Sequence, residues 1–130
     1  MKKEFVPYNL ALELKELGFD EPCLAFYDGK GNDQIYFNSI RNGSGDYEPF
    51  KKNERLKWFG APTSSQAFRW FRNQFGLYAW VKMEYGYDGF IPTYVIRGVR
   101  QDDIPGGPFN TYEEAELACL RKLIQIVKNK

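Results

Sequence analysis

The sequence predicts an α+β fold in which three helices alternate with pairs of strands in the order αββ–αββ–α. Three stretches carry apolar residues at helical spacing, and they begin near residues 7, 63 and 111. The first two are each followed by two short apolar runs separated by turn-forming residues, as in β-hairpins. A length of 130 residues is typical of one domain, so we expect a single domain over residues 1–130.

The two αββ segments resemble each other, which predicts an internal repeat over residues 5–38 and 62–99. In each segment a proline precedes the helix and a glycine, Gly18 or Gly76, follows it. Two such units can form one four-stranded antiparallel sheet with helices packed mainly on one face, and we favour this arrangement. The alternative is that only residues 62–130 form a compact core, against which the N-terminal unit docks.

The first repeat begins with a helix from about Pro7 to Leu17. Its apolar residues Leu10, Leu14 and Leu17 recur at i, i+4 and i+7. Proline at the start and glycine just past the end fit the usual asymmetry of helix termini.

A hairpin and a long loop follow this helix. Strands are predicted over residues 23–27 and 34–37, because turn-forming residues separate two apolar runs. Residues 38–62 are rich in Asn, Gly, Ser and charged residues, and we interpret them as a variable loop with one short strand near residues 56–59. Long loops in compact domains are often functional.

The second repeat begins with a helix that starts at a capping box, Thr63 with Gln66. Its apolar stripe consists of Ala67, Phe68, Phe71 and Phe75, with Trp70 at the edge. A strand is then predicted over residues 77–85, because apolar and polar side chains alternate. The core-facing set of this strand is Leu77, Ala79, Val81, Met83 and Tyr85, and the opposite set is Tyr78, Trp80, Lys82 and Glu84.

The end of the chain is predicted to add one strand and one helix. A return strand is expected over residues 93–99, after a Gly-rich turn. The C-terminal helix, over residues 111–128, begins with a second capping box formed by Thr111 and Glu114.

The composition excludes several classes of catalytic site. The chain has no histidine, which removes Ser-His-Asp and Cys-His catalysis and most zinc sites. Cys23 and Cys119 stand far apart in apolar contexts and are interpreted as buried free thiols. No glycine-rich phosphate-binding motif is present. We therefore expect no cofactor and no enzymatic activity, while Asp88, Asp102 and Asp103 leave a carboxylate-bound metal ion as a weaker alternative.

Charge and hydropathy bear on the partner and the compartment. The net charge of +1 gives no bulk field that would select nucleic acid or an anionic membrane. The sequence shows neither an apolar signal segment at its start nor a run of about 20 apolar residues. We therefore expect a cytoplasmic protein without a membrane partner.

Aromatic and basic residues of the second repeat are the best candidates for a binding surface. Aromatic residues make up 18% of the chain, and we expect some of them at the surface. Rings beside Arg and Lys can stack on bases and neutralise phosphates, and an exposed aromatic strand face is typical of an interaction surface. The alternative, that the rings edge the core and the charges are ordinary solvated side chains, stays open. The candidates are Arg69, Arg72, Tyr78, Trp80, Lys82 and Arg97.

Three blocks of the sequence are distinctive, and they are Phe5 to Cys23, Gln66 to Arg72 and Thr111 to Leu120. In these blocks the chain resembles an uncharacterised family of short proteins from Bacteroidetes and their tailed phages, including crAss-like phages. The resemblance spans almost the whole chain and implies no activity, substrate or catalytic residues. It implies a phage or prophage context, the cytoplasm of the infected cell and an accessory role.

Together these observations favour a non-enzymatic accessory binding protein that acts on a host or defence component. It would inhibit a host protein or sequester a small nucleotide ligand, and assembly into a homo-oligomer stays open. The first alternative is a small nucleic-acid-binding module that uses the aromatic and basic residues, including the charged segment 51–57. The weaker alternative is a carboxylate-dependent metal hydrolase.

Overall fold

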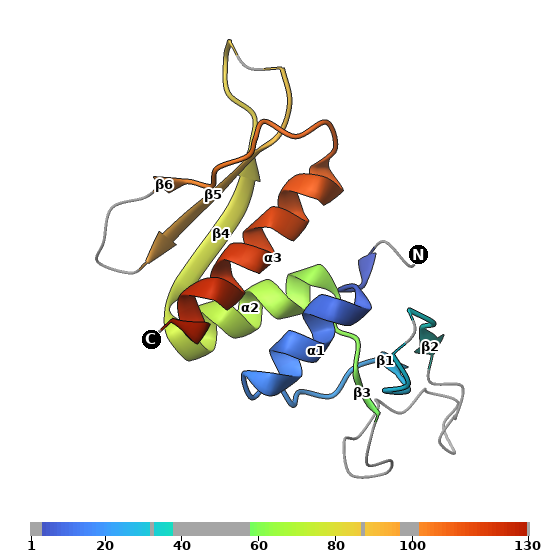
Figure 1. Ribbon diagram of the computed structural model, residues 1–130. Coiled ribbons are helices and arrows are strands. Elements are labelled where there is room, and N and C mark those ends of the chain that lie inside the picture. The colour runs from blue at the N-terminus through green and yellow to red at the C-terminus, as the bar shows by residue number, and fades with distance from the viewer. Residues whose placement is uncertain (1–3, 32, 38–57, 87, 97–101, 130) are drawn as a thin grey trace, which may run out of the picture. The chain divides into compact units, whose positions relative to one another are not determined.

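The computed structural model describes residues 4–31, 33–37, 58–86, 88–96 and 102–129, and these residues form an α+β fold (Figure 1). The chain divides into two compact units, residues 1–64 and 65–130. Most of the predicted variable loop, residues 38–57, lies outside the described residues. The elements are α1 (Tyr8–Glu16), β1 (Ala25–Tyr27), β2 (Tyr36–Phe37), β3 (Phe59–Gly60), α2 (Ser64–Phe75), β4 (Leu77–Lys82), β5 (Ile91–Ile96), β6 (Asp102–Asp103) and α3 (Tyr112–Lys128).

Each unit has its own three-stranded antiparallel sheet, rather than a share in the one four-stranded sheet that we predicted. The strand orders are β2-β1-β3 and β4-β5-β6. Both predicted hairpins are present, and a two-residue strand completes each sheet by pairing with β1 or β5. The α+β class is confirmed. The prediction of a single domain over residues 1–130 stays a prediction.

Helix α1 begins and ends where the sequence predicts. Pro7 is the N-cap residue, and Gly18 has a positive φ of 105°. The Gly18 N–H donates to the Lys15 carbonyl oxygen at 3.0 Å, and the Phe19 N–H donates to the Leu14 carbonyl oxygen at 2.9 Å. This pair of hydrogen bonds is a Schellman motif, which requires a left-handed residue that glycine provides without steric cost.

The core of the first unit is built on α1, β1 and the residues that precede α1. Its fully or nearly buried side chains include Val6, Leu10, Leu14, Phe19, Tyr27 and Phe59. The Tyr27 hydroxyl donates to the Val6 carbonyl oxygen at 2.8 Å. The Val6 N–H in turn donates to the Pro62 carbonyl oxygen at 2.8 Å. Buried polar groups therefore find partners inside this unit.

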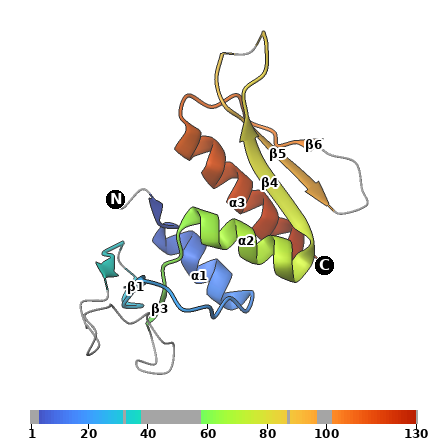
Figure 2. The same cartoon turned by 180° about the vertical axis from the view of Figure 1, so that it is seen from behind.

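In the second unit, α3 covers one face of the β4–β5 hairpin, and it runs along the hairpin in both views (Figure 1 and Figure 2). The Nζ of Lys122 on α3 lies 5.3 Å from the centre of the Tyr94 ring. Tyr94 pairs with Ala79 across the hairpin, and directly opposite residues lie on the same face. Helix α3 therefore packs against the face that carries Ala79 and Val81.

The start of α3 confirms the Thr111 half of the predicted capping box. The Thr111 hydroxyl oxygen accepts a hydrogen bond from the Glu114 N–H at 3.1 Å. The buried side chains of α3 are Ala115, Cys119, Leu120, Leu123 and Ile124.

Strand β4 is shorter than predicted, because it ends at Lys82 rather than Tyr85. Met83 and Tyr85 were expected to face the core, but Met83 is 72% exposed and Tyr85 is fully exposed. Their alternation continues that of β4, yet β5 begins only at Ile91, opposite Lys82. Without a paired strand, the alternation no longer places a side chain in a core.

Two further expectations concern β5, β6 and Trp70. Strand β5 begins at Ile91 rather than at residue 93, and the predicted residues 97–99 lie outside the described residues. Asp102 and Asp103, which lie outside the predicted strands, form β6. Trp70, expected at the edge of the α2 stripe, is only 4% exposed and packs edge-on against the rings of Phe71 and Phe75.

Cys23 and Cys119 are both buried and free, as predicted. Among the described residues, no helix combines the length and the apolar character needed to cross a membrane.

Candidate functional site

Three of the six predicted binding residues share one face of β4. Tyr78, Trp80 and Lys82 occupy alternate positions, on the face opposite to the one that α3 covers. Tyr78 and Trp80 are each 38% exposed. We refer to these three residues as the β4 outer face. The predicted aromatic surface on this strand is therefore present, and what binds to it stays a prediction.

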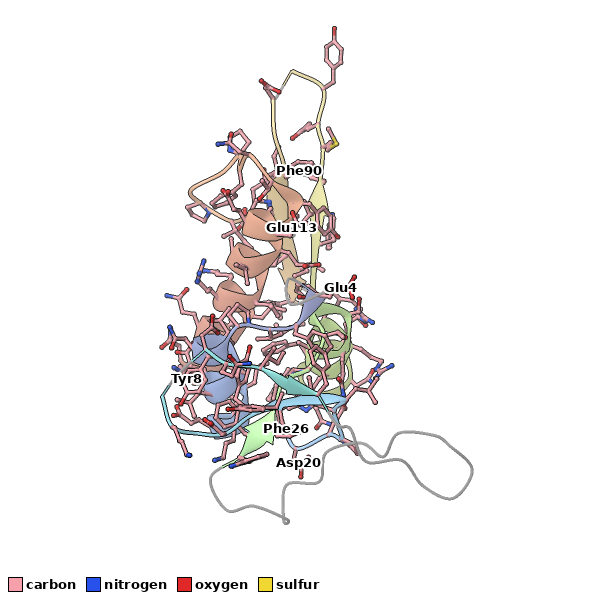
Figure 3. The ribbon with its side chains drawn as sticks, turned by 90° about the vertical axis from the view of Figure 1, so that its right-hand side faces the viewer. Glu4, Tyr8, Asp20, Phe26, Phe90 and Glu113 are labelled. Atoms are coloured by element: carbon pink, nitrogen blue, oxygen red, sulfur yellow. The ribbon has the colours of Figure 1, made fainter. Side chains whose placement is uncertain are left out.

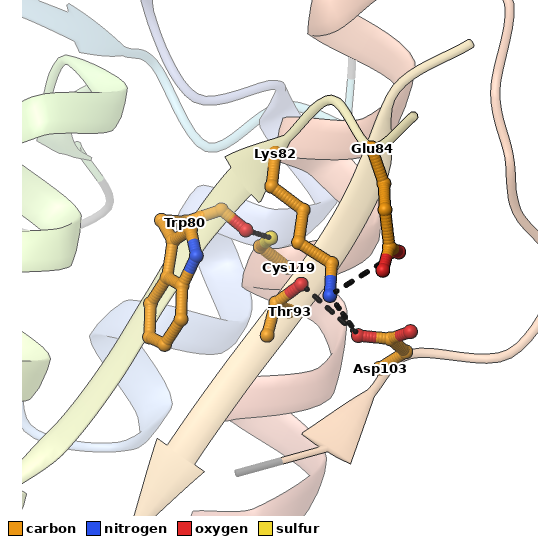
Figure 4. A network of polar contacts seen from close by, with 6 residues as sticks. All are labelled: Trp80, Lys82, Glu84, Thr93, Asp103 and Cys119. Atoms are coloured by element: carbon orange, nitrogen blue, oxygen red, sulfur yellow. Dashed lines mark hydrogen bonds and ion pairs between the residues drawn. The ribbon is translucent and has the colours of Figure 1, made fainter. Parts of the chain in front are cut away.

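The charge of Lys82 is compensated on the same face (Figure 4). Its Nζ lies 3.0 Å from Asp103 Oδ1 and 3.7 Å from Glu84 Oε2. The Thr93 hydroxyl donates to the same Asp103 oxygen at 3.3 Å. The hydrogen bond with Asp103 raises the pKa of Lys82, so the amine is a cation at neutral pH. Two neighbouring carboxylates offset this cation, which makes Lys82 a poor partner for a phosphate.

The two predicted arginines of α2 differ in their relation to Trp80. Arg69 and Arg72 are both exposed on α2, but only Arg72 lines the cleft that Trp80 also lines. Arg97 lies outside the described residues. The structure thus brings Arg72 and Trp80 to one place.

That cleft is partly open, has a volume of about 230 Å³ and lies within the second unit. Its lining residues from α2 recur at i, i+3 and i+7, and those from α3 at i and i+4, so each helix contributes one face. Trp80 belongs to both the cleft and the β4 outer face. The lining consists of Ser65, Phe68 and Arg72 from α2, Ala79, Trp80 and Val81 from β4, and Tyr112 and Glu116 from α3.

The cleft runs along the edge of β4. Successive side chains of a strand point to opposite faces, so a cavity on one face would be lined by alternate residues only. Three consecutive residues, Ala79 to Val81, line this cleft. Strand β4 is also an edge strand of its sheet. The cleft therefore lies beside backbone that no described strand covers.

Two titratable groups near the cleft, the Cys119 thiol and the Tyr112 hydroxyl, keep their protons at neutral pH. The Cys119 thiol donates to the Trp80 carbonyl oxygen at 3.5 Å, and burial raises its pKa to about 11. Burial, and secondarily the charge of Glu116, also raises the pKa of Tyr112. A thiol with a raised pKa is a weak nucleophile, so Cys119 is suited to packing rather than to covalent catalysis.

The carboxylates offer little to a metal ion in the part of the chain that the structure describes. No group of three or more His, Cys, Asp or Glu side chains is placed there to hold one. Asp103, one of the carboxylates named for the weaker metal-ion alternative, pairs with Lys82 and accepts a hydrogen bond from Thr93.

The first unit carries an aromatic cluster that we did not predict as a functional surface. The rings of Phe26, Tyr36 and Trp58, referred to below as the ring cluster, have interplanar angles of 16 to 25° and centroid distances of 4.6 to 5.9 Å. Phe26 and Tyr36 are directly opposite across the β1–β2 pair, and Figure 3 labels Phe26 on this sheet. An aromatic residue in each strand of the predicted hairpin was the available signal. Trp58 could not be added, because it joins the cluster only through the pairing of β3 with β1.

The comparisons with known proteins find no match, whether to a protein family model, to a curated protein or to a solved structure. No relative therefore supplies a substrate or a partner. What the cleft can bind has to follow from its size, its charges and the strand beside it.

Proposed function

We propose that the chain is a non-enzymatic accessory protein that binds another protein through the cleft and the β4 outer face. The position of Trp80 carries this proposal, because this residue belongs to both surfaces and is 38% exposed. Tryptophan combines a large apolar ring with one N–H donor, and it is enriched among the residues that dominate protein interfaces.

The dimensions of the cleft favour a protein partner over a sequestered nucleotide. Small-molecule pockets typically occupy about 300–1,000 Å³ and enclose most of the ligand, whereas this cleft is smaller, at about 230 Å³, and partly open. Arg72 and Glu116 bring opposite charges to its lining, as in the polar rim of a protein interface. The resemblance to phage-encoded proteins supports a host protein as the partner, with inhibition as the outcome.

The test is affinity capture from a bacterial host lysate, followed by mass spectrometry and a binding titration with the captured protein. Trp80→Ala should weaken binding by about 2 kcal/mol or more, roughly 30-fold. Because Trp80 is partly exposed, this variant should keep a melting temperature close to that of the wild type. Tyr85→Ala is the matched control, since Tyr85 is a fully exposed ring outside both surfaces. Equal capture by the wild type and by Trp80→Ala would contradict the proposal.

One observation favours nucleic-acid binding as a second function. The ring cluster presents near-parallel rings on a sheet, and some single-strand binders stack bases on aromatic side chains of a β-sheet. The β4 outer face gives this function less support, because Lys82 is paired with Asp103 and Glu84.

A fluorescein-labelled oligo-dT strand tests the second function by fluorescence anisotropy. Binding should weaken between about 50 and 200 mM salt. Tyr36→Ala should reduce binding, whereas Trp80→Ala should leave it unchanged. No binding of the labelled strand at the lower salt concentration would count against this function.

A further inference from the structure

We propose that the protein partner binds as an extended strand added to the free edge of β4, with one of its side chains in the cleft. This inference rests on the proposed function of protein binding, and it names the form that the bound segment takes.

The register of the sheet shows which backbone groups of β4 point away from β5. The Ile104 N–H donates to the Pro92 carbonyl oxygen at 2.9 Å, and Ile104 follows directly on β6. In an antiparallel strand, the N–H and C=O of one residue point to the same side, so the backbone of Pro92 faces β6. Val81 lies opposite Pro92 and therefore belongs to a non-hydrogen-bonded pair. Its own N–H and C=O point to the free edge, and by the two-residue period those of Ala79 do the same.

These outward groups lie at the cleft. Ala79 and Val81 both line it, with Trp80 between them. Among the described residues, no backbone hydrogen bond joins either of them to a segment other than β5. A row of outward N–H and C=O groups is a template for another strand. An added strand would use both groups of both residues.

The lining of the cleft indicates the side chains that such a strand carries. Phe68 and Tyr112 provide ring surface, and Arg72 provides an exposed cation. In strand addition the backbone hydrogen bonds give affinity, while pockets for alternate side chains give specificity. We therefore expect a segment with an apolar residue that enters the cleft and a carboxylate nearby that pairs with Arg72.

A second copy of this chain is the competing occupant of the same edge. Pairing of two β4 strands about a two-fold axis places the same surface on both sides of the interface. Arg72 and Glu116 both line the cleft beside this edge, so two copies would bring two cations and two carboxylates to one narrow space. A segment of another protein adds only the one carboxylate that pairs with Arg72.

A bead-displayed library of random twelve-residue peptides probes this edge, with the full-length chain as bait. The tightest peptide is resynthesised with a single N-methyl group at each position in turn. An added strand donates hydrogen bonds from every second residue. Methylation should therefore weaken binding at least tenfold at alternate positions and leave the intervening positions almost unchanged. A peptide whose binding is weakened without this alternation would overturn strand addition. If Trp80→Ala also fails to bind that peptide, the proposed function would still stand.

Substitution in the chain gives an independent measurement. Val81→Pro removes an outward N–H without removing a β4–β5 hydrogen bond, and proline is tolerated at such edge positions. It should abolish peptide binding with little change in melting temperature, whereas Tyr85→Ala, at a fully exposed position outside both surfaces, should bind as the wild type does. A library in which no peptide prefers the wild type over Val81→Pro would overturn the inference.

Amide hydrogen exchange of the wild type covers the case in which Val81→Pro fails to fold. In the free chain the Ala79 and Val81 amides should exchange quickly, while those of Tyr78, Trp80 and Lys82 should be slow. The selected peptide should slow the first two at least tenfold. Slow exchange of Ala79 and Val81 in the free chain that becomes fast on dilution would instead assign the edge to a second copy and overturn the inference.

Discussion

At the scale of the residue, the hydroxyl of Tyr27 shows how one buried polar group contributes to stability. It donates to the Val6 carbonyl oxygen at 2.8 Å, and the Tyr27 side chain is fully buried. Tyr27→Phe keeps the ring but leaves that carbonyl oxygen without this donor. A buried acceptor that loses its partner costs about 1–3 kcal/mol, and we expect a decrease of this size in the free energy of unfolding, measured by urea denaturation.

Tyr85→Phe is the matched control for this loss. It removes the same hydroxyl group from a ring that is fully exposed, where substitutions usually stay within about 0.5 kcal/mol. If both variants lower the free energy of unfolding by the same amount, the hydrogen bond from Tyr27 to the Val6 carbonyl oxygen does not stabilise the fold.

At the scale of the element, the start of α3 depends on one side chain. The Thr111 hydroxyl oxygen accepts from the Glu114 N–H, which satisfies a backbone donor that the helix itself cannot pair. Thr111→Ala should lower the free energy of unfolding by about 0.5–2 kcal/mol. Thr111→Ser keeps the acceptor and should stay close to the wild type in the same urea titration. A loss for Thr111→Ser as large as that for alanine would assign the effect to the threonine methyl group instead.

Also at the scale of the element, some helices and strands could be predicted from the sequence and others could not. Helices α1 and α3 were predicted closely, because their ends are set by local residues such as Gly18 and Thr111. The strands β3 and β6 have two residues each, which are too few for an alternation to be recognised. A short strand was predicted near residues 56–59 without its pairing to β1, and β6 was not predicted. The two separate sheets could not be predicted for the same reason. Strand β4 was extended too far, because Met83 and Tyr85 continue its alternation where the paired strand has ended.

The candidate site follows the same division between local and long-range information. The exposed face of Tyr78 and Trp80 is a local property of one strand and was predicted. The compensation of Lys82 by Asp103 requires the pairing of β5 with β6, and the cleft requires residues of α2, β4 and α3 together. The residue pattern of a single helix or strand therefore predicts neither the ion pair of Lys82 nor the cleft.

At the scale of the whole molecule, the shifted ionisable groups predict how stability depends on pH. In the described part of the chain, burial and, to a lesser extent, the charge of Asp33 raise the pKa of Tyr27 to about 12. Burial is also the main cause that raises the pKa of Cys119 to about 11. The native state therefore holds these protons more tightly than the unfolded chain does. Stability from such groups is complete below their unfolded pKa values, 9.0 for Cys119 and 10.0 for Tyr27. It is lost as the pH rises through the raised values.

We therefore expect a flat stability profile near neutrality and a decline in alkali. The chain has no histidine, so no side chain with an ordinary pKa titrates between about pH 6 and 8. The urea midpoint should be constant over that range and should fall as the pH rises above about 9, where the unfolded Cys119 thiol begins to ionise. Cys119→Ala should show a shallower decline between about pH 9 and 11, because one of the two protons is then absent from both states. A midpoint that rises between pH 8 and 11 would contradict the raised pKa values, and a step near pH 6.5 would contradict the assignment of the pH dependence to these groups.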